Sequence, residues 1–311
     1  VMLRRIEHEA CDPSVESYRC MPMTAANSEF NAVVQLAGGF GNQLFQYAFG
    51  MQLQAVHGLR VGYDTEFYRQ PNSVEHNRLH LVELGFDVPM VAPSETMFQA
   101  ARRLKWLPSS VQQAVLGFTY SKCPTDRYEP VSISPGINYF AGLWHSPQYF
   151  DGIHGDVRAA FKPRLTAACD NQHERRDGVV GFHVRRGDYL THAPSYNLDY
   201  AAFLSAARDR LNEITGMSDM PIVVFSDDPD WCEAHLVQPG VRINRAGSML
   251  DDFLGFMNCQ HKIIANSTFA WWAAFLGDID GGSTIAPQRW HANAELAQTQ
   301  ILMPNWLVVD Y

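Results

Sequence analysis

Short apolar runs alternate with longer segments of helical period through the second half of the chain. Residues 178–184, 221–226 and 262–265 are runs of the kind that form buried strands. Segments 198–214 and 267–277 carry apolar residues at the spacing of one helix face. The same pattern predicts helices at 228–236 and 249–260 and strands at 241–244 and 283–287. Strands that alternate with helices of about 10–15 residues are typical of an α/β fold with a parallel, doubly wound sheet.

The first half of the chain opens with the same alternation. Residues 31–37 form a strand-type run that ends in glycines, residues 42–58 have helical spacing, and residues 59–64 form a second strand-type run. Residues 65–130 mix short helical stretches with loops, and we assign them no detailed structure. We therefore predict a loose extension over residues 1–30, an N-terminal domain over residues 31–165 and a C-terminal domain over residues 166–311.

Composition restricts the classes of function. The chain has 311 residues, more than a single hydrophobic core usually serves, which agrees with two domains. Its net charge is -9 and its basic residues come in pairs at most, so no nucleic-acid partner is expected. The six cysteines include no CxxC, which indicates a reduced intracellular protein without a structural metal. The longest apolar run, Phe269–Leu276, is far shorter than the ~20 residues that span a bilayer.

Polar residues follow four of the predicted strands, at the edge where ligands bind in parallel sheets. The four clusters are Gly38 to Gln43, Arg185 to Asp188, Ser226 to Asp228, and Asn266 to Thr268. We expect all four at the same edge. Each also has a structural interpretation, because glycines make tight turns and the residues at 226–229 and 266–268 suit helix starts. A helix start at 266–268 is compatible with a phosphate contact. The aspartates at 278–280 stand among glycines and predict a turn rather than a metal site.

Arg185 and Arg186 favour an anion as ligand. A guanidinium is always charged, and its planar fork binds a phosphate or diphosphate with two hydrogen bonds. An ion pair with Asp188 would occupy one guanidinium and leave the other. His183 alternates with the arginines on the predicted strand, and a packed core histidine is an equally open interpretation.

Together these stretches resemble one known family. GGFGNQLFQYAFG, FHVRRGDY, VVFSDDPDWC and HKIIANSTFAWWAAFL resemble, in this order, motifs of the bacterial α-1,2-fucosyltransferases of glycosyltransferase family 11. YFAGLWHSPQYF and IAPQRW also match, so the resemblance covers nearly all of residues 31–311. It implies an α/β fold of GT-B type, with two Rossmann-like domains facing each other across a cleft. It also implies inverting transfer of L-fucose from GDP-fucose, held by the C-terminal domain, to a galactose 2-hydroxyl, with no cofactor and no divalent metal.

The resemblance also assigns roles to individual residues. Arg185, Asp188 and His183 are the expected catalytic residues: Arg185 grips the diphosphate as charge develops on it, and Asp188 orients the arginines. The expected donor-binding residues are Arg186, Asp227, Asp228, Asp252, Asn266, Ser267, Thr268, Gly39, Gly41, Asn42 and Gln43. Among these, Asp252 would accept hydrogen bonds from guanine, and Asn42 and Gln43 would reach across from the first loop. The sequence does not identify one general base. Asp64, Glu66 and Asp188 are possibilities, and none of them lies in a distinctive motif.

Alternative functions remain open from the sequence. An NAD-dependent oxidoreductase would require a third glycine where Leu44 stands. A fucosyltransferase of another linkage, or an inactive nucleotide-sugar or glycan-binding module, would share the donor residues. For the enzyme, we expect GDP-fucose and a galactose-terminated oligosaccharide or lipid-linked glycan as partners. We expect a cytoplasmic location, with peripheral contact at the inner membrane where lipid-linked glycans are built.

Overall fold

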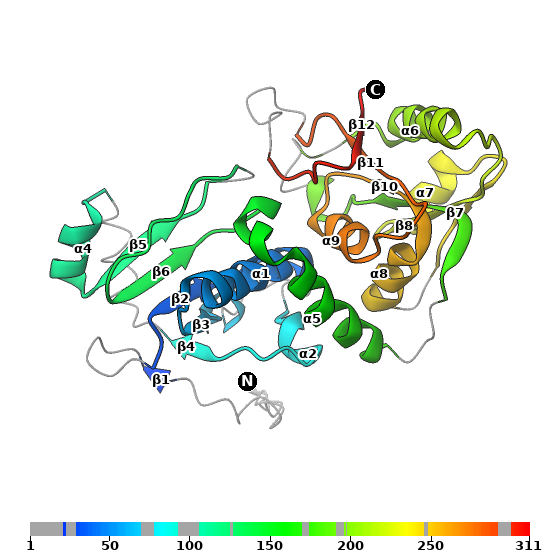
Figure 1. Ribbon diagram of the computed structural model, residues 1–311. Helices are drawn as coiled ribbons and strands as arrows, with labels where there is room; N and C mark the ends of the chain where they lie inside the picture. The colour runs from blue at the N-terminus through cyan, green and yellow to red at the C-terminus, as the bar shows by residue number, and fades with distance from the viewer. Residues whose placement is uncertain are drawn as a thin grey trace, which may run out of the picture.

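The computed structural model describes residues 21–22, 29–69, 78–92, 106–124, 127–169, 174–190, 196, 198–245, 248–291 and 300–311. In this part of the chain there are two six-stranded sheets, at left and right in Figure 1, with helices packed on them and between them. The strand pairings recorded in both sheets are parallel. These two α/β halves confirm the predicted fold class, α/β of GT-B type with two Rossmann-like domains.

The first sheet is built from the first half of the chain. Its strands, in spatial order, are β1 (Met21–Pro22), β4 (Met90–Ala92), β3 (Val61–Asp64), β2 (Ala32–Gln35), β6 (Ile137–Ala141) and β5 (Phe118–Lys122). The helices of this half are α1 (Phe40–His57), η2 (Glu66–Arg69), α2 (His80–Glu83), α4 (Ser109–Leu116), η3 (Pro147–Ile153) and α5 (His154–Ala167). Val33 and Val34 point to opposite faces of β2 and are both fully buried, because both faces of this central strand are covered.

The second sheet is built from the second half of the chain. Its strands, in spatial order, are β12 (Leu307–Val309), β11 (Thr284–Pro287), β10 (Cys259–Ile264), β7 (Arg176–Val184), β8 (Ile222–Ser226) and β9 (Val241–Ile243). Its helices are η4 (Asp188–Leu190), α6 (Tyr200–Thr215), α7 (Pro229–Leu236), α8 (Met249–Met257) and α9 (Thr268–Leu276). Local signals end these helices: α6, for example, begins at Asp199, which accepts from the Ala202 N–H, and stops at Gly216 in the left-handed conformation.

The two halves meet through α1 and α9, which lie between the sheets in Figure 1. Helix α9 carries apolar residues on all sides, and its residues from 270 to 276 are buried. The ring of Phe45 on α1 packs 4.6 Å from the ring of Trp271 and 5.0 Å from that of Trp272. Phe150 of η3 stacks on Trp272 at 5.5 Å. One continuous hydrophobic cluster therefore belongs to both domains.

Gly41 lets the starts of α1 and α9 approach at backbone distance. A Cβ at this position would lie 2.5 Å from the carbonyl carbon of Thr268 and 2.6 Å from the backbone nitrogen of Phe269. Those distances are far inside van der Waals contact, so the contact between the helices requires glycine here. Two helix N-termini, one from each domain, are thereby brought side by side.

The chain passes from the first half to the second through α5, and the predicted domain boundary between residues 165 and 166 falls near the end of this helix. Arg158 on α5 donates to the Phe275 carbonyl at 3.0 Å, so α5 also contacts the end of α9. Most of the predicted N-terminal extension lies outside the described residues, and residues 21–22 pair with β4. Within the described part of the chain, no helix is both long and apolar enough to cross a bilayer.

The strands and helices predicted for the second half are present, with one clear error. The predicted helix 249–260 stops at Met257, and Cys259 already belongs to β10, where its backbone pairs with β7. In the first half, β4, α4 and β5 lie in segments to which no structure was assigned, and β12 was also missed. Strands of three residues, such as β4 and β12, are too short to show a period.

Candidate active site

The register of the second sheet brings three of the four predicted clusters together. Val184 pairs with Ser226, and His183 pairs with Ile264, so the chain leaves β7, β8 and β10 at one edge. Residues 185–188 follow β7 directly, Ser226 ends β8 and precedes Asp227 and Asp228, and residues 266–268 follow β10 after Ala265. The fourth cluster follows β2 of the other sheet, so the prediction of a single edge is wrong for Gly38 to Gln43. That cluster reaches the others because α1 starts against α9.

Asp227 organises the loop that carries the two arginines. Its carboxylate accepts hydrogen bonds from the backbone N–H of Arg186 at 2.9 Å and of Gly187 at 3.1 Å. The same carboxylate pairs with Arg185, whose Nη1 lies 2.9 Å from Oδ2. A Cβ at position 187 would lie 2.7 Å from Asp227 Oδ2, so the carboxylate occupies the space that glycine leaves. The Arg185 side chain keeps 26% of its surface exposed.

Arg186 is held more tightly than Arg185. Its Nε lies 3.1 Å from Asp228 Oδ2, and its guanidinium lies 3.8 Å above the ring of Trp231. Asp228 also caps α7 by accepting from the Trp231 N–H at 3.1 Å. Only 13% of the Arg186 side chain is exposed. The expected donor role of Arg186 and Asp228 therefore has a strong structural alternative, a stacked ion pair that fixes the start of α7.

The partners of the arginines differ from those expected from the sequence. Asp227 and Asp228 lie at the end of the neighbouring strand, β8. Asp228 is 42 residues along the chain from its partner, Arg186. The side chain of Asp188, expected to orient the arginines, lies outside the described side chains, and its backbone begins η4. In the described part of the loop, the two arginines are oriented by Asp227 and Asp228, which were expected to bind the donor.

His183 is a core histidine in this structure. It is 5% exposed, and its ring packs 5.1 Å from Phe269 and 5.9 Å from Phe256. Burial, with a smaller contribution from the charge of Arg185, lowers the pKa of His183 to about 3. The imidazole is therefore neutral near pH 7 and a poor proton acceptor. His183 was expected among the catalytic residues, but its burial and ring contacts fit the packed-histidine interpretation.

The third cluster divides between structure and the start of α9. Asn266 donates to the carbonyls of Tyr196 at 2.7 Å and Trp290 at 2.9 Å, and so ties two loops together. Ser267 is the N-cap residue of α9 but its hydroxyl makes no cap hydrogen bond within the described residues. The Thr268 hydroxyl donates to Asn42 Oδ1 at 3.0 Å. Backbone N–H groups at an N-terminus without a side-chain cap suit an anion.

The first loop places Asn42 at the domain contact and Gln43 away from it. Gly39 is the N-cap of α1, and Asn42 bonds to Thr268 of the other domain. Gln43 is fully buried and donates to the carbonyls of Gly38 at 3.1 Å and Arg78 at 2.7 Å. The expectation that Gln43 reaches across to the donor is thus wrong here, because these bonds direct its amide into the first domain.

Asp252 is a half-buried carboxylate in the first turn of α8. Asn244 donates to its Oδ1 at 2.7 Å. Burial raises the pKa of Asp252 to about 6, the bond from Asn244 opposes that shift, and the neighbouring Asp251 adds to it. The next residue, Phe253, packs 5.3 Å from Phe40 at the start of α1. Asp252 therefore lies close to the domain contact and changes its charge just below neutral pH.

The two described carboxylates that were candidate bases, Asp64 and Glu66, each have partners within the first domain. Asp64 is 1% exposed, accepts a hydrogen bond from the Tyr139 hydroxyl and bonds to the Glu66 N–H at 2.9 Å. Burial raises its pKa despite these bonds. Glu66 pairs with Arg69 on the surface, with about half of its side chain exposed. Asp64 supports the end of β3 rather than contacting a ligand.

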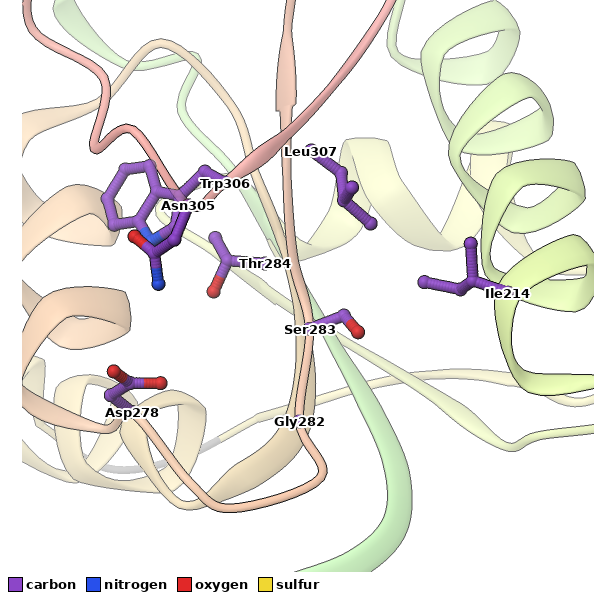
Figure 2. Close-up of a pocket in the computed structure, with 8 residues that line it drawn as sticks. All are labelled: Ile214, Asp278, Gly282, Ser283, Thr284, Asn305, Trp306 and Leu307. Carbon is purple, nitrogen blue, oxygen red and sulfur yellow. The ribbon is translucent and has the colours of Figure 1, made fainter.

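A surface pocket exists at the other end of the second sheet. Its volume is about 290 Å³, and Figure 2 shows Thr284 and Leu307, the first residues of β11 and β12, on its wall opposite Ile214 of α6. Ligands of parallel sheets bind beyond the carboxyl ends of the strands, not at their starts. This pocket is therefore not the candidate active site. Among the described residues, no group of three or more His, Cys, Asp or Glu side chains is placed to hold a metal ion.

Comparison with protein families shows to which family this chain belongs. The profile described as Glycosyl transferase family 11 matches residues 104–310, about two thirds of the chain. This chain belongs to glycosyltransferase family 11. The family 11 protein is therefore a glycosyltransferase, and the oxidoreductase alternative is set aside.

Named relatives of this family 11 protein come from bacteria and primates. An alpha-1,2-colitosyltransferase of Escherichia coli is 27% identical over 89% of this chain and 98% of its own length. A galactoside alpha-(1,2)-fucosyltransferase 1 of Saimiri boliviensis boliviensis is 26% identical over 88% of this chain and 73% of its own length. Among solved structures, the fucosyltransferase NodZ from Bradyrhizobium matches with a TM-score of 0.43 and 15% identity, over 82% of this chain and 97% of that one.

One residue at the site was not singled out from the sequence. His145 lies in the LWHSPQYF stretch, which contributed to the family resemblance without a role of its own. In the structure His145 Nε2 lies 2.9 Å from Asn42 Oδ1. The available signal was a polar residue within an aromatic, buried stretch, and nothing in its spacing indicated a partner on α1.

Proposed function

We propose that this family 11 protein transfers L-fucose from GDP-fucose to the 2-hydroxyl of a galactoside, with inversion at the sugar carbon and without a divalent metal. The observation that carries the proposal is the partly exposed Arg185 at the end of β7, whose neighbour β10 leads into the uncapped start of α9. A guanidinium and uncapped helix N–H groups together suit a diphosphate. The names of the relatives support a sugar of the fucose type and a galactoside acceptor.

Arg185 would neutralise the departing GDP. In the proposed reaction the bond between the fucose carbon and the diphosphate oxygen breaks, and the galactose O2 attacks from the opposite face. The leaving diphosphate keeps the bonding electrons, so negative charge builds on it in the transition state. A fixed guanidinium stabilises the transition state, where this charge is larger, more than it stabilises the bound ground state. That difference in stabilisation accelerates the reaction. Asp227 holds Arg185 in place before the donor arrives.

The guanine base would be recognised by Asp252. An ionised carboxylate can accept two hydrogen bonds, and guanine presents adjacent N–H donors on one edge. Asn244 fixes one oxygen of Asp252 through a 2.7 Å bond and so orients the carboxylate. The position of Phe253 against α1 places this contact near the domain junction, where a nucleotide sugar would lie between the domains.

Transfer would proceed without a strong general base. Asp64 is buried behind Tyr139, and Glu66 lies on the surface, so neither offers a carboxylate to the acceptor hydroxyl. A transition state in which the sugar–phosphate bond is largely broken makes the sugar carbon strongly electrophilic. The attacking hydroxyl then loses its proton late, and solvent or the leaving phosphate can accept it.

A calorimetric titration with GDP, GDP-fucose and NAD in the presence of EDTA tests the donor site. We expect micromolar GDP binding to the wild-type protein and at least about tenfold weaker binding to Arg185→Ala, because a charge-assisted phosphate contact is lost. Arg210→Ala is the control, since Arg210 forms an exposed ion pair with Glu213 on α6. The proposal is wrong if GDP does not bind, binds only with a divalent metal, or binds Arg185→Ala as tightly as wild type.

A colitose donor is the second candidate, because of the relative named alpha-1,2-colitosyltransferase. Colitose differs from fucose in lacking one ring hydroxyl, so both donors would use the same diphosphate and guanine contacts. Turnover with the two nucleotide sugars at equal concentration distinguishes them. If the colitose donor is turned over faster, colitose and not fucose is the transferred sugar. The proposed roles of Arg185 and Asp252 would be unchanged.

A further inference from the structure

A single amide oxygen joins the two domains beside the proposed donor site. Asn42 Oδ1 accepts from the hydroxyl of Thr268, which starts α9, at 3.0 Å. His145 Nε2, from the loop after β6, lies 2.9 Å from the same oxygen. An amide oxygen only accepts hydrogen bonds, so both partners donate and His145 carries a hydrogen on Nε2. The oxygen is thus held from two sides, by one donor from each domain.

These two bonds also fix where the nitrogen of the Asn42 amide points. The amide is planar, so holding its oxygen turns Nδ2 to the other side, toward the glycines that precede α1. A Cβ at position 38 would lie only 2.4 Å from Nδ2, so a larger residue there would displace the amide. Gly38 also has φ +80, which glycine adopts without strain. No described residue accepts a hydrogen bond from Nδ2. Its two N–H donors therefore face the loop at which α1 and α9 meet.

The backbone around His145 is held in an uncommon conformation. Trp144 has φ 57, and it is the one non-glycine residue with positive φ in the described stretches. It is 2% exposed, and its ring stacks 3.9 Å from Phe49. On the other side, the Ser146 hydroxyl donates to the Gln300 carbonyl at 2.8 Å. Strained residues persist where the surroundings enforce them, often at functional sites.

The geometry points to His145 as a positioning residue for sugar transfer, acting through Asn42. It holds the Asn42 amide so that Nδ2 presents its N–H groups to the donor sugar or its phosphate when the two domains are in register. This inference rests on the proposed function, because it needs a nucleotide sugar at this junction. It adds a residue of the first domain, distant from the Arg185 loop, to the machinery of transfer.

A double-mutant cycle on GDP-fucose turnover tests the inference, with GDP release as the readout. His145→Phe keeps an aromatic ring but removes the donor. We expect it to lower kcat roughly 10–100-fold, as for other residues that orient a ligand-binding group. Its KM for GDP-fucose should change less than about threefold, since the diphosphate contacts remain. Added to Asn42→Ala, His145→Phe should lower kcat no further, because His145 acts through Asn42.

Two further variants separate positioning from packing. His145→Gln restores an N–H donor at similar reach and should recover most of kcat. His154→Phe is the control for a change at the same domain contact, because the His154 ring packs 5.1 Å from Phe150 and 5.4 Å from Phe275. It should leave kcat unchanged. Equal losses in the Gln and Phe variants, or additive losses in the cycle, overturn the inference.

The same cycle on urea unfolding distinguishes this inference from the proposed donor. Release of no GDP from GDP-fucose by wild-type protein counts against the proposed function alone. The unfolding cycle then decides the hydrogen bond by itself: non-additive losses support the His145–Asn42 pair, and additive losses overturn it. In an active enzyme, the losses at positions 145 and 42 could be non-additive in unfolding free energy and additive in kcat. That result assigns His145 a structural role and overturns the inference.

Discussion

Arg185 has an anion beside it even before a ligand binds, the carboxylate of Asp227 at 2.9 Å. A partly exposed ion pair contributes little to stability, about 0–1 kcal/mol. Because a guanidinium has five N–H donors, Arg185 can bind a diphosphate while Asp227 still holds it. Arg186 is also paired, with Asp228, but its guanidinium lies 3.8 Å from the ring of Trp231, whereas that of Arg185 lies 5.9 Å from the ring of Tyr189. We therefore assign the proposed donor contact to the more exposed Arg185 and a structural role in the loop to Arg186.

The charge of Asp252 should make donor affinity depend on pH. Its pKa of about 6 means that it is ionised at pH 7.5 and mostly protonated at pH 5. Since only the ionised carboxylate accepts both guanine hydrogen bonds, GDP affinity should fall as the pH is lowered, by roughly tenfold at pH 5. Calorimetric titration with GDP between pH 5 and 8 measures this loss.

Two substitutions isolate the Asp252 contribution from titration of the GDP phosphate. Asp252→Asn should bind GDP weakly at every pH and lose the part of the pH dependence that belongs to the carboxylate. Asp251→Asn removes the neighbouring charge that raises the pKa of Asp252, so its affinity should persist to lower pH. Identical pH profiles for wild type and Asp252→Asn would contradict the assignment of guanine recognition to Asp252.

Residue identities at the strand ends were predictable from the sequence, but their partners were not. A parallel sheet places polar residues at its carboxyl edge, which is why Arg185, Asp227 and Thr268 could be selected. The pairing of Arg185 with Asp227 depends on the register of β7 against β8, which places Val184 opposite Ser226. The burial of His183, which makes it a core residue, likewise depends on how α8 and α9 pack across the sheet.

Among the elements, the contact between the starts of α1 and α9 gives the sharpest prediction. Gly41→Ala would place a Cβ 2.5 Å from the Thr268 carbonyl carbon, where backbone cannot yield easily. We expect a loss of about 1–3 kcal/mol in the free energy of unfolding, together with reduced donor turnover because Thr268 and Asn42 move apart. Urea unfolding and GDP release measure the two effects.

Gly155 of α5 provides the matched control for that substitution. No heavy atom lies within 4 Å of a Cβ built at Gly155, and the residue is helical. Gly155→Ala should therefore keep or raise stability, by up to about 1 kcal/mol, through the lower backbone entropy of the unfolded chain. Equal stability of Gly41→Ala and Gly155→Ala would show that the helix starts are not in tight contact.

Helices and strands with a clear period were predicted well, and short elements were not. The second half alternates long helices with continuous apolar strands, so the periodicity identified them. The end of α8 was misplaced because Phe253, Phe256 and Met257 continue an apolar pattern into Cys259, where the backbone turns into β10. The approach of α1 to α9 could not be predicted, since nothing in one helix specifies contact with a helix more than 200 residues away.

At the scale of the whole molecule, the two domains share one hydrophobic cluster. Side chains of α1, η3 and α9, among them Phe45, Phe150 and Trp272, pack together across the junction. Neither domain would keep its core covered if the other unfolded. We therefore expect a single thermal transition, with equal calorimetric and van't Hoff enthalpies, in differential scanning calorimetry. Two resolved transitions, one for each sheet, would contradict this account of the junction.

Helix α9 packs in the cores of both halves, and this limits how the halves of related enzymes can be exchanged. In a chimera that joins the first half of one relative to the second half of another, α9 would meet an α1 shaped for a different partner. The starts of both helices would have to be exchanged as a unit, with the residues around positions 41 and 268 kept together. Residues at this contact between α1 and α9 can change only together. Segments away from the contact can change independently, and we expect differences in acceptor preference to arise there.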